Sequence, residues 1–314
     1  MIPTIDAGYQ RRRAGAWEQA SVVDSHPRRV HIVVSIVEEA GMPEAPDLEV
    51  IKAFLNRRVQ GRQISSARVL KSTVLRSPAG DFPGDIQGRT LDQVHRRGKF
   101  LLAELSGDRW LAINPMLTGA LQYCEPRTRV YKKTCIVLSL AEGGELRYLD
   151  DRQMGKVYYV NHAQLAQVPL LNEQGPDVLE GITFEEFTGR LRRFHGEIKG
   201  VLTRGALISG IGNAYSDEIL FAAGLSPFRK SQSLSPEELG RLFEQCPAVV
   251  REAISVLGQR MAEDIHVKVR DFLKVHNKGG RPCPGCGGNI SQITANQRIT
   301  SFCRRCQPGM LIKN

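Results

Sequence analysis

The sequence lacks any hydrophobic run long enough to cross a membrane. The best candidate, residues 30–37, falls far short of the roughly 20 residues that a spanning helix needs. The sequence also lacks a secretory signal, an internal repeat and a low-complexity segment. These absences argue against a membrane, secreted or repeat protein. What remains is a chain of 314 residues with an ordinary hydrophobic fraction of 41%, long enough to bury a sizeable core in two domains.

The charge balance is basic. Forty-three Lys and Arg residues oppose 33 Asp and Glu residues, which gives a net charge of +10, and the pI is near 9.4. Such a surplus favours a polyanionic partner, most simply nucleic acid, although many basic proteins bind none.

Seven cysteines are present, and four of them form two pairs with C-x2-C spacing, Cys283 with Cys286 and Cys303 with Cys306. The odd total, the lack of a secretory signal and this spacing argue for a reducing compartment and a metal site rather than disulfides. Four thiolates satisfy tetrahedral zinc, and the 16 residues between the pairs allow a β-hairpin to bring the pairs together. The spacing therefore predicts one structural Zn2+, with no open position for catalysis.

Hydrophobic patterning divides the chain into regions of different character. Residues 1–42 are rich in arginine but too acidic for a good targeting peptide, so we interpret them as a non-functional extension, such as upstream sequence translated in error. From residue 64 to about 160, short β-rich runs alternate with turn signals, which predicts an antiparallel sandwich or barrel. The pattern then becomes helical, with a break at Pro247 and helices expected over residues 183–194, 197–203, 214–223 and 235–261.

A short stretch, Gly41 to Glu49, precedes an amphipathic run, so a helix is expected to begin near Pro46. On this local pattern alone, a capped surface helix explains the residues. However, the order Met-Pro-Glu-x-Pro-Asp-x-Glu resembles the start of the Fpg/Nei family of DNA glycosylases. The resemblance covers roughly residues 42–308 and is carried further by residues 96–102, 198–199, 208–227 and 297–307.

The resemblance implies an α+β fold in three parts. These are an N-terminal antiparallel β-sandwich with flanking helices over residues 43–162, a helix–two-turn–helix domain over 163–265, and a zinc-finger β-hairpin over 266–308. It also implies a repair enzyme that flips out and excises oxidatively damaged bases, then cleaves the abasic site by elimination. The expected partner is double-stranded DNA containing damaged bases or abasic sites, with no membrane partner. We expect a monomer in the bacterial cytoplasm, associated with the nucleoid through DNA.

The resemblance also assigns the chemistry. The amine of Pro43 is the nucleophile at C1′ of the sugar, Glu44 protonates the opening sugar, and Lys99 reaches the phosphates or the opened sugar. Glu49 is expected to orient the amine or Glu44. A proline nitrogen in a peptide bond with Met42 is delocalised into the amide and cannot form an iminium. We therefore predict that the active protein begins at Pro43.

For DNA binding, the resemblance assigns backbone contacts to Lys199, Asn213 and Arg298. In this interpretation, Gly210 and Gly212 let the backbone approach a phosphate at the start of a helix. The local patterns also allow plainer explanations. Gly-x-Gly-Asn is usually a tight turn, and a hairpin arginine is commonly solvated. The basic residues around Lys99 are likewise typical of a solvated strand edge.

Two loops, residues 114–119 and 150–155, depart from the family pattern. By position, the side chains that fill the gap left by the extruded base are Leu117, Arg152 and Met154. The alternative interpretation is that these three are ordinary core and loop residues with no part in DNA binding. The segment 267–277 is also shorter than the loop that caps an oxidised purine in typical family members. We therefore expect oxidised pyrimidines or a broad lesion range as substrates.

Two alternatives to an enzyme remain on the sequence alone. A family member whose proline is blocked would grip damaged DNA without catalysis. A zinc-ribbon RNA-binding protein would not explain Pro43 and Glu44. Glu44 and Lys99 favour the enzyme, because binding alone does not need them. The extension favours the binding protein, because the chemistry cannot tolerate it.

Overall fold

The computed structural model describes residues 41–295 and 298–309. These residues all belong to the same structural unit of the chain. The predicted extension, residues 1–42, therefore lies almost entirely outside the described residues. Within the described ranges, no helix is both long and apolar enough to cross a membrane.

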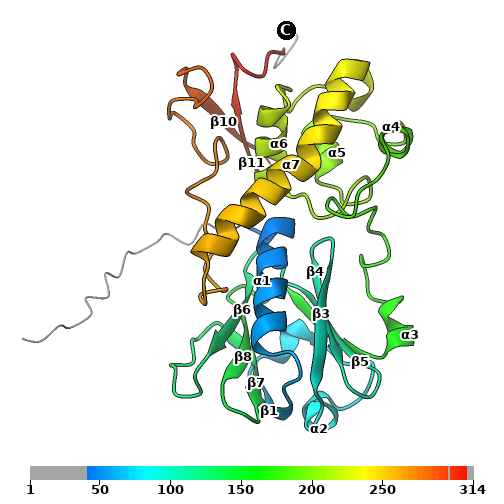
Figure 1. Cartoon of the computed structure of the whole chain (residues 1–314), viewed down its shortest axis with the longest axis vertical. Coiled ribbons are helices and arrows are strands. Elements are labelled where there is room, and N and C mark those ends of the chain that lie inside the picture. The colour runs from blue at the N-terminus through cyan, green and yellow to red at the C-terminus, as the bar shows by residue number, and fades with distance from the viewer. Residues whose placement is uncertain (1–40, 296–297, 310–314) are drawn as a thin grey trace, which may run out of the picture. The chain divides into compact units, whose positions relative to one another are not determined.

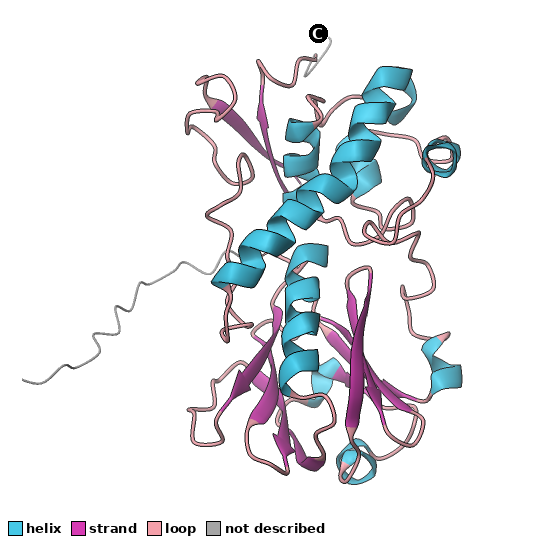
Figure 2. Cartoon of the chain, in the orientation of Figure 1, coloured by secondary structure: helices cyan, strands magenta, loops and turns pink. Residues whose placement is uncertain are grey.

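The N-terminal half is a sandwich of two β-sheets (Figure 2). The first sheet has the order β1 (Ile64–Val69), β7 (Thr134–Leu140), β8 (Glu145–Asp150) and β6 (Gly119–Cys124). The second has the order β2 (Leu75–Arg76), β9 (Lys156–Val160), β5 (Arg109–Asn114), β4 (Phe100–Leu105) and β3 (Leu91–Arg97). Every neighbouring pair is antiparallel except β2 and β9. The predicted antiparallel sandwich is confirmed.

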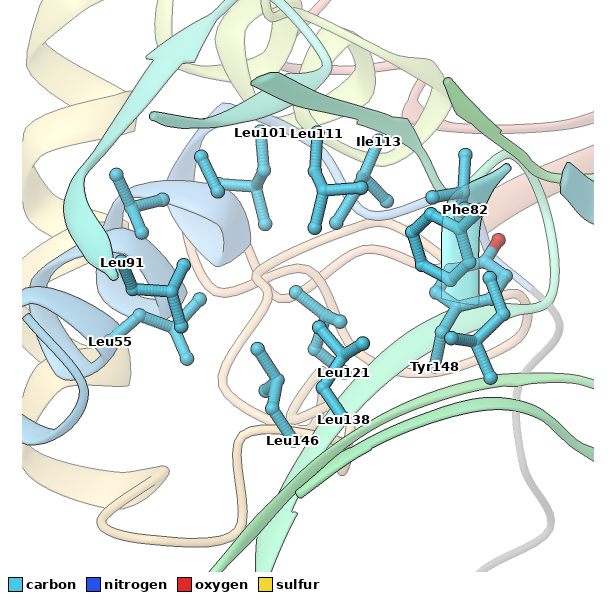
Figure 3. Close-up of a pocket in the computed structure, with 14 residues that line it drawn as sticks. Leu55, Phe82, Leu91, Leu101, Leu111, Ile113, Leu121, Leu138, Leu146 and Tyr148 are labelled. Carbon is cyan, nitrogen blue, oxygen red and sulfur yellow. The ribbon is translucent and has the colours of Figure 1, made fainter. Parts of the chain in front are cut away.

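The sandwich core is built from leucines of both sheets and of helix α1 (Ala45–Arg58). Figure 3 shows Leu91, Leu101 and Leu111 of the five-stranded sheet facing Leu121, Leu138 and Leu146 of the other. They enclose a hydrophobic cavity of about 30 Å³. A space of this size between packed sheets is a packing void, and its lining is almost entirely apolar.

Helix α1 starts as the sequence predicts. Glu44 is its N-terminal cap, and the Glu44 backbone N–H donates to Asp47 Oδ2 at 2.9 Å. Pro46 lies in the first turn, where a missing N–H costs nothing. Further along the helix, Leu48, Ile51 and Phe54 are buried at helical spacing in the sandwich core.

The C-terminal half is helical. It contains the four expected helices as α4 (Phe184–Leu191), α5 (Ile198–Leu202), α6 (Asn213–Ala222) and α7 (Pro236–Arg260). The shorter elements of the described chain are α2 (Phe82–Ile86), α3 (His162–Leu165) and the 3-10 turns Ser72–Val74 and Ser231–Ser233.

The predicted break at Pro247 is wrong, because α7 runs through it. A capping box at Ser235 starts the helix, and the buried side chains Leu242, Cys246 and Val250 hold the same face on both sides of the proline. This packing outweighs the lost backbone hydrogen bond. The helix packs against both α1 and α6 (Figure 1), so it joins the two halves.

The chain then forms a β-hairpin, with β10 (Ile290–Ala295) paired to β11 (Arg298–Cys303). This is the hairpin expected between the two cysteine pairs.

Candidate functional site

The first residues of α1 meet the start of α6. Pro43 and Glu44 are both buried. One oxygen of the Glu44 carboxylate accepts from the Gly212 N–H at 2.6 Å and from the Tyr215 N–H at 3.2 Å. The other accepts from the Ala214 N–H at 2.9 Å. The predicted nucleophile and its acid partner thus sit where the β-sandwich half joins the helical half.

Gly212 allows this approach. A Cβ placed on Gly212 would lie 2.3 Å from the Glu44 Cδ and 2.5 Å from its Oε1, so no larger residue fits. The sequence predicts that the glycines let the backbone approach a phosphate. In the structure, the free amides at the start of α6 are instead occupied by a carboxylate of the same chain.

Lys99 lies in the two-residue turn between β3 and β4, directly after Gly98, whose φ is +57°. This turn is clamped to the helical half by Asp177. The Arg96 guanidinium donates to both oxygens of Asp177 at 2.6 and 2.5 Å. The Gly98 N–H donates to Asp177 Oδ2 at 3.1 Å. Lys99 is therefore presented from a rigid turn.

Glu49 holds this clamp rather than the nucleophile. Its carboxylate accepts from Arg96 Nε at 2.6 Å and pairs with Lys52 Nζ at 2.5 Å. The expectation that Glu49 orients Glu44 or the Pro43 amine is therefore not met in this geometry. Glu49 lies one helical turn further along α1, where its side chain reaches β3 instead.

Lys199 and Asn213 both face β11. The Lys199 ammonium lies 2.7 Å from Asp217 Oδ1. It also donates to the Ile299 carbonyl at 2.6 Å and to Thr300 Oγ1 at 3.0 Å. Asn213 Nδ2 donates to the same Ile299 carbonyl at 2.9 Å. In this structure, the two side chains expected to contact DNA tie the helices to the hairpin.

Lys99 and Lys199 share two charged neighbours, Glu44 and Arg298. Arg298 is exposed at the start of β11. Burial lowers the pKa of Lys99 and of Lys199. The Glu44 carboxylate acts to raise both pKa values, and the Arg298 guanidinium acts to lower them. The structure therefore brings Lys99, Lys199 and Arg298 from three separate elements into one electrostatic neighbourhood with Glu44. A site of this charge suits a phosphate backbone.

The two divergent loops meet at one end of the sandwich. Asp150 links them, because its carboxylate accepts from Thr118 Oγ1 of one loop and, at 2.7 Å, from the Gly155 N–H of the other. Each loop also carries a non-glycine residue with positive φ, Met116 at +50° and Gln153 at +53°. Backbone strain of this kind tends to cluster at functional sites.

The predicted wedge residues lie on these two loops. Met154 is 38% exposed, Arg152 is exposed and Leu117 is half-buried. The Arg152 N–H donates to Thr118 Oγ1 at 3.3 Å, which places Arg152 beside the loop that carries Leu117. The structure thus brings the three residues to one end of the sandwich.

The segment before the hairpin carries a residue that the sequence did not single out. Arg270 makes a two-pronged ion pair with Asp47, at 2.7 and 2.6 Å. Its guanidinium also lies 5.5 Å from the ring centroid of Tyr215. Burial alone would lower the pKa of Arg270, but the adjacent Asp47 carboxylate raises it above its ordinary value. A basic residue in a short loop gives no sequence signal for such a partner.

The four paired cysteines form one cluster. Their sulfur atoms all lie within 4.8 Å of one another. The Sγ atoms of Cys283 and Cys306 are 3.7 Å apart, and those of Cys286 and Cys303 are 3.4 Å apart. Burial would raise the pKa of Cys303, but the Cys306 amide and the Cys286 thiol lower it to about 7. Four close sulfurs of this kind could bind a metal ion, and they fit the tetrahedral set that zinc prefers.

Comparisons with known proteins agree with these observations. Residues 42–157 match the model of the formamidopyrimidine-DNA glycosylase N-terminal domain, and residues 175–264 match that of the formamidopyrimidine-DNA glycosylase H2TH domain. A formamidopyrimidine-DNA glycosylase of Symbiobacterium thermophilum is 35% identical over 274 residues, covering 85% of this chain and 90% of the relative. A formamidopyrimidine-DNA glycosylase of Pelotomaculum thermopropionicum is 33% identical over 273 residues, which cover 85% of this chain and 99% of the relative.

Solved structures extend the comparison. The complex of Lactococcus lactis Fpg with DNA containing an abasic site matches with a TM-score of 0.78 and 26% identity, over 85% of this chain and all of that one. The wild-type protein of the same organism, bound to DNA containing N7-benzyl-Fapy-dG, matches with a TM-score of 0.78 and 27% identity, over the same shares. The resemblance expected from the sequence is thus confirmed, and the chain belongs to the formamidopyrimidine-DNA glycosylase family.

Proposed function

We propose that this protein excises oxidatively damaged bases from double-stranded DNA and cleaves the resulting abasic site, with the Pro43 amine as nucleophile. The observation that carries the proposal is the buried pair Pro43 and Glu44 at the junction of the two halves, with the glutamate fixed by three amides of α6. A surface cap would not need its carboxylate gripped by an element 168 residues away.

The chemistry follows from a free secondary amine at Pro43. The amine attacks C1′ of the flipped-out nucleotide and a C1′–N bond forms. The bond from C1′ to the damaged base breaks, and the base leaves with that electron pair and with the proton that the amine gives up. The sugar ring opens to give an iminium at C1′. This cation makes the neighbouring protons acidic, so elimination cleaves the DNA backbone beside the lesion.

Glu44 is the acid partner in this scheme. A carboxylate offers about four acceptor positions, and α6 amides fill three of them. The remaining position can carry the proton that the sugar ring oxygen takes as it opens. Lys99, on its clamped turn, reaches the phosphates or the opened sugar.

The active form must begin at Pro43, because an amide nitrogen has no lone pair to donate. The match to the family's N-terminal domain begins at residue 42. The Pelotomaculum relative is covered over 99% of its length by only 85% of this chain. Both observations support initiation at Met42 and removal of that residue, or proteolysis, as the origin of the active form.

The DNA partner is held by its backbone. Arg298 is exposed and grips a phosphate, while Lys199 and Asn213 exchange the Ile299 carbonyl for a phosphate oxygen. Leu117, Arg152 and Met154 fill the gap left by the extruded base. One Zn2+ on the four cysteines holds the hairpin in place and takes no part in the reaction. The protein acts as a monomer.

A product assay separates this function from the alternative, a family member that binds damaged DNA without catalysis. The form Pro43–Asn314 is mixed with a duplex carrying one oxidised base, and both the free base and the cut strand are measured. The proposal predicts both products. Tight binding with neither product would instead support the non-catalytic binder.

A further inference from the structure

A short strap, residues 266–273, crosses from the end of α7 towards the cysteine hairpin. It is held firmly at one end, because the backbone N–H groups of Lys274, Val275 and His276 all donate to the Glu218 carboxylate at 2.8 to 2.9 Å. In its middle, the buried pair of Arg270 and Asp47 fixes it to the first turn of α1. Side chains of the strap near Arg270 are therefore presented from a rigid support.

Lys268 reaches from this strap to the chain just ahead of Pro43. Its ammonium donates to the carbonyl oxygen of Gly41, two residues before Pro43. It also donates to the Leu117 carbonyl at 3.0 Å, on one of the two wedge loops. A single ammonium group thus bridges the chain just ahead of Pro43 and the loop that faces the extruded base.

The Gly41 carbonyl lies in space that the substrate would occupy in the active form. In the 314-residue chain, the Pro43 nitrogen is bonded to the carbonyl carbon of Met42. When that residue is absent and the amine attacks, the new bond joins the same nitrogen to C1′ of the sugar. C1′ and the groups it carries then enter the space that Met42 and Gly41 occupy. Since consecutive Cα atoms are about 3.8 Å apart, this space extends only roughly 8 Å from Pro43.

We propose that Lys268 is a substrate-contacting specificity residue, which donates a hydrogen bond to an oxygen atom of the extruded oxidised base. The inference rests on the proposed function. The Gly41 carbonyl stands in for that oxygen in the longer chain, and the ammonium is already aimed at it. Oxidised bases carry additional carbonyl or hydroxyl oxygens, whereas an abasic sugar carries no base, and its C1′ oxygen is lost when the iminium forms. Lys268 therefore acts on base excision and not on the opened sugar.

The test uses the form Pro43–Asn314, which should fold alone. The hydrophobic cores of the described chain lie within it, and complete relatives align with this part of the chain. Single-turnover excision is measured on duplexes carrying thymine glycol or 8-oxoguanine. Borohydride trapping is measured on a duplex with a preformed abasic site. Both are compared for wild type, Lys268→Met and Lys268→Arg.

A hydrogen bond from a charged donor is worth roughly ten- to a hundredfold in rate. Lys268→Met should lose about this much in excision of at least one lesion, with trapping on the abasic duplex within about twofold of wild type. Lys268→Arg, which keeps the charge and the donors, should recover most of the loss. If Lys268→Met melts at a lower temperature, Lys268→Gln keeps a neutral donor for the Leu117 carbonyl but loses the charge, and it should show a smaller loss that is still confined to excision.

Unchanged excision by Lys268→Met would overturn the inference. So would an equal loss on the lesion and abasic duplexes, because Lys268 would then act on the strap or on the Pro43 amine. A wild-type form that neither excises nor traps would show that the proposed function itself fails, and the inference with it. If the wild-type form both excises and traps, and only the expected effect of the Lys268 variants is absent, then the inference alone fails.

Discussion

Replacing Gly212 with alanine should disable the site without touching the nucleophile. The new methyl group would lie 2.3 Å from Glu44 Cδ and 2.7 Å from its Cγ, well inside any real contact. These atoms belong to a buried side chain whose carboxylate is bound on both oxygens, so it cannot swing aside at little cost. Either Glu44 leaves the amides of α6 or α6 shifts away from α1.

The magnitude follows from the bonds at risk. The hydrogen bond from the Gly212 N–H to Glu44, 2.6 Å long, is the first to break. A hydrogen bond to a charged group contributes about 2 kcal/mol, which corresponds to roughly 30-fold in rate. If all three amide contacts are lost, the effect is about 6 kcal/mol, or on the order of 10⁴-fold. We expect Gly212→Ala to lose between these two values in borohydride trapping.

The assay is single-turnover trapping of Pro43–Asn314 on abasic DNA, with thermal melting followed by circular dichroism. Gly200→Ala is the matched control, because Gly200 lies in α5, is exposed and has no atom near the position of an added Cβ. That variant should trap as wild type does and melt at the same or a slightly higher temperature. A folded Gly212→Ala variant that traps at the wild-type rate would refute the idea that α6 holds Glu44 for catalysis.

Three further outcomes are expected. Arg298→Ala should weaken binding to all duplexes alike, because phosphates carry no sequence information. The slope of log binding constant against log salt concentration, roughly −4 to −5 for wild type, should become shallower by about 1. Binding independent of salt would count against this interface. Cys286→Ser should lose the one zinc found by metal analysis and lower the melting temperature; a metal-free protein that stays folded and binds DNA normally would contradict a structural zinc. Excision should extend beyond 8-oxoguanine to formamidopyrimidines and oxidised pyrimidines; a strong preference for 8-oxoguanine opposite cytosine would show that the short strap does not broaden the lesion range.

Local features of the fold were predictable from sequence. The start of α1 depends on residues within one turn, Glu44, Pro46 and Asp47, so their order in the chain is sufficient to place it. The cysteine cluster depends on two short spacings and a hairpin between them, and the sulfur atoms do come together. The strand β3 gives a weaker sequence signal, because Arg96 and Arg97 interrupt its apolar pattern. The Arg96 side chain is buried only through partners elsewhere in the chain.

The parts of the site that depend on distant partners were not predictable. The sequence shows Gly212 beside a helix start, which is equally suited to a phosphate or to a carboxylate of the same chain. Only the fold brings Glu44 to it from 168 residues away. Likewise, nothing near Arg270 indicates that its partner is Asp47. Charged pairs of this kind carry no periodicity, so sequence patterns cannot reveal them.

The claim that the Pro43 amine attacks the sugar is tested most directly by locating the borohydride adduct. Pro43–Asn314 and the 314-residue chain are each trapped on abasic DNA and digested, and the peptide that carries the nucleotide is identified by mass spectrometry. We predict an adduct on the N-terminal proline of Pro43–Asn314 and none on the longer chain. An adduct of the longer chain on another residue, together with full trapping by Pro43→Gly, would contradict both the nucleophile and the start of the active protein.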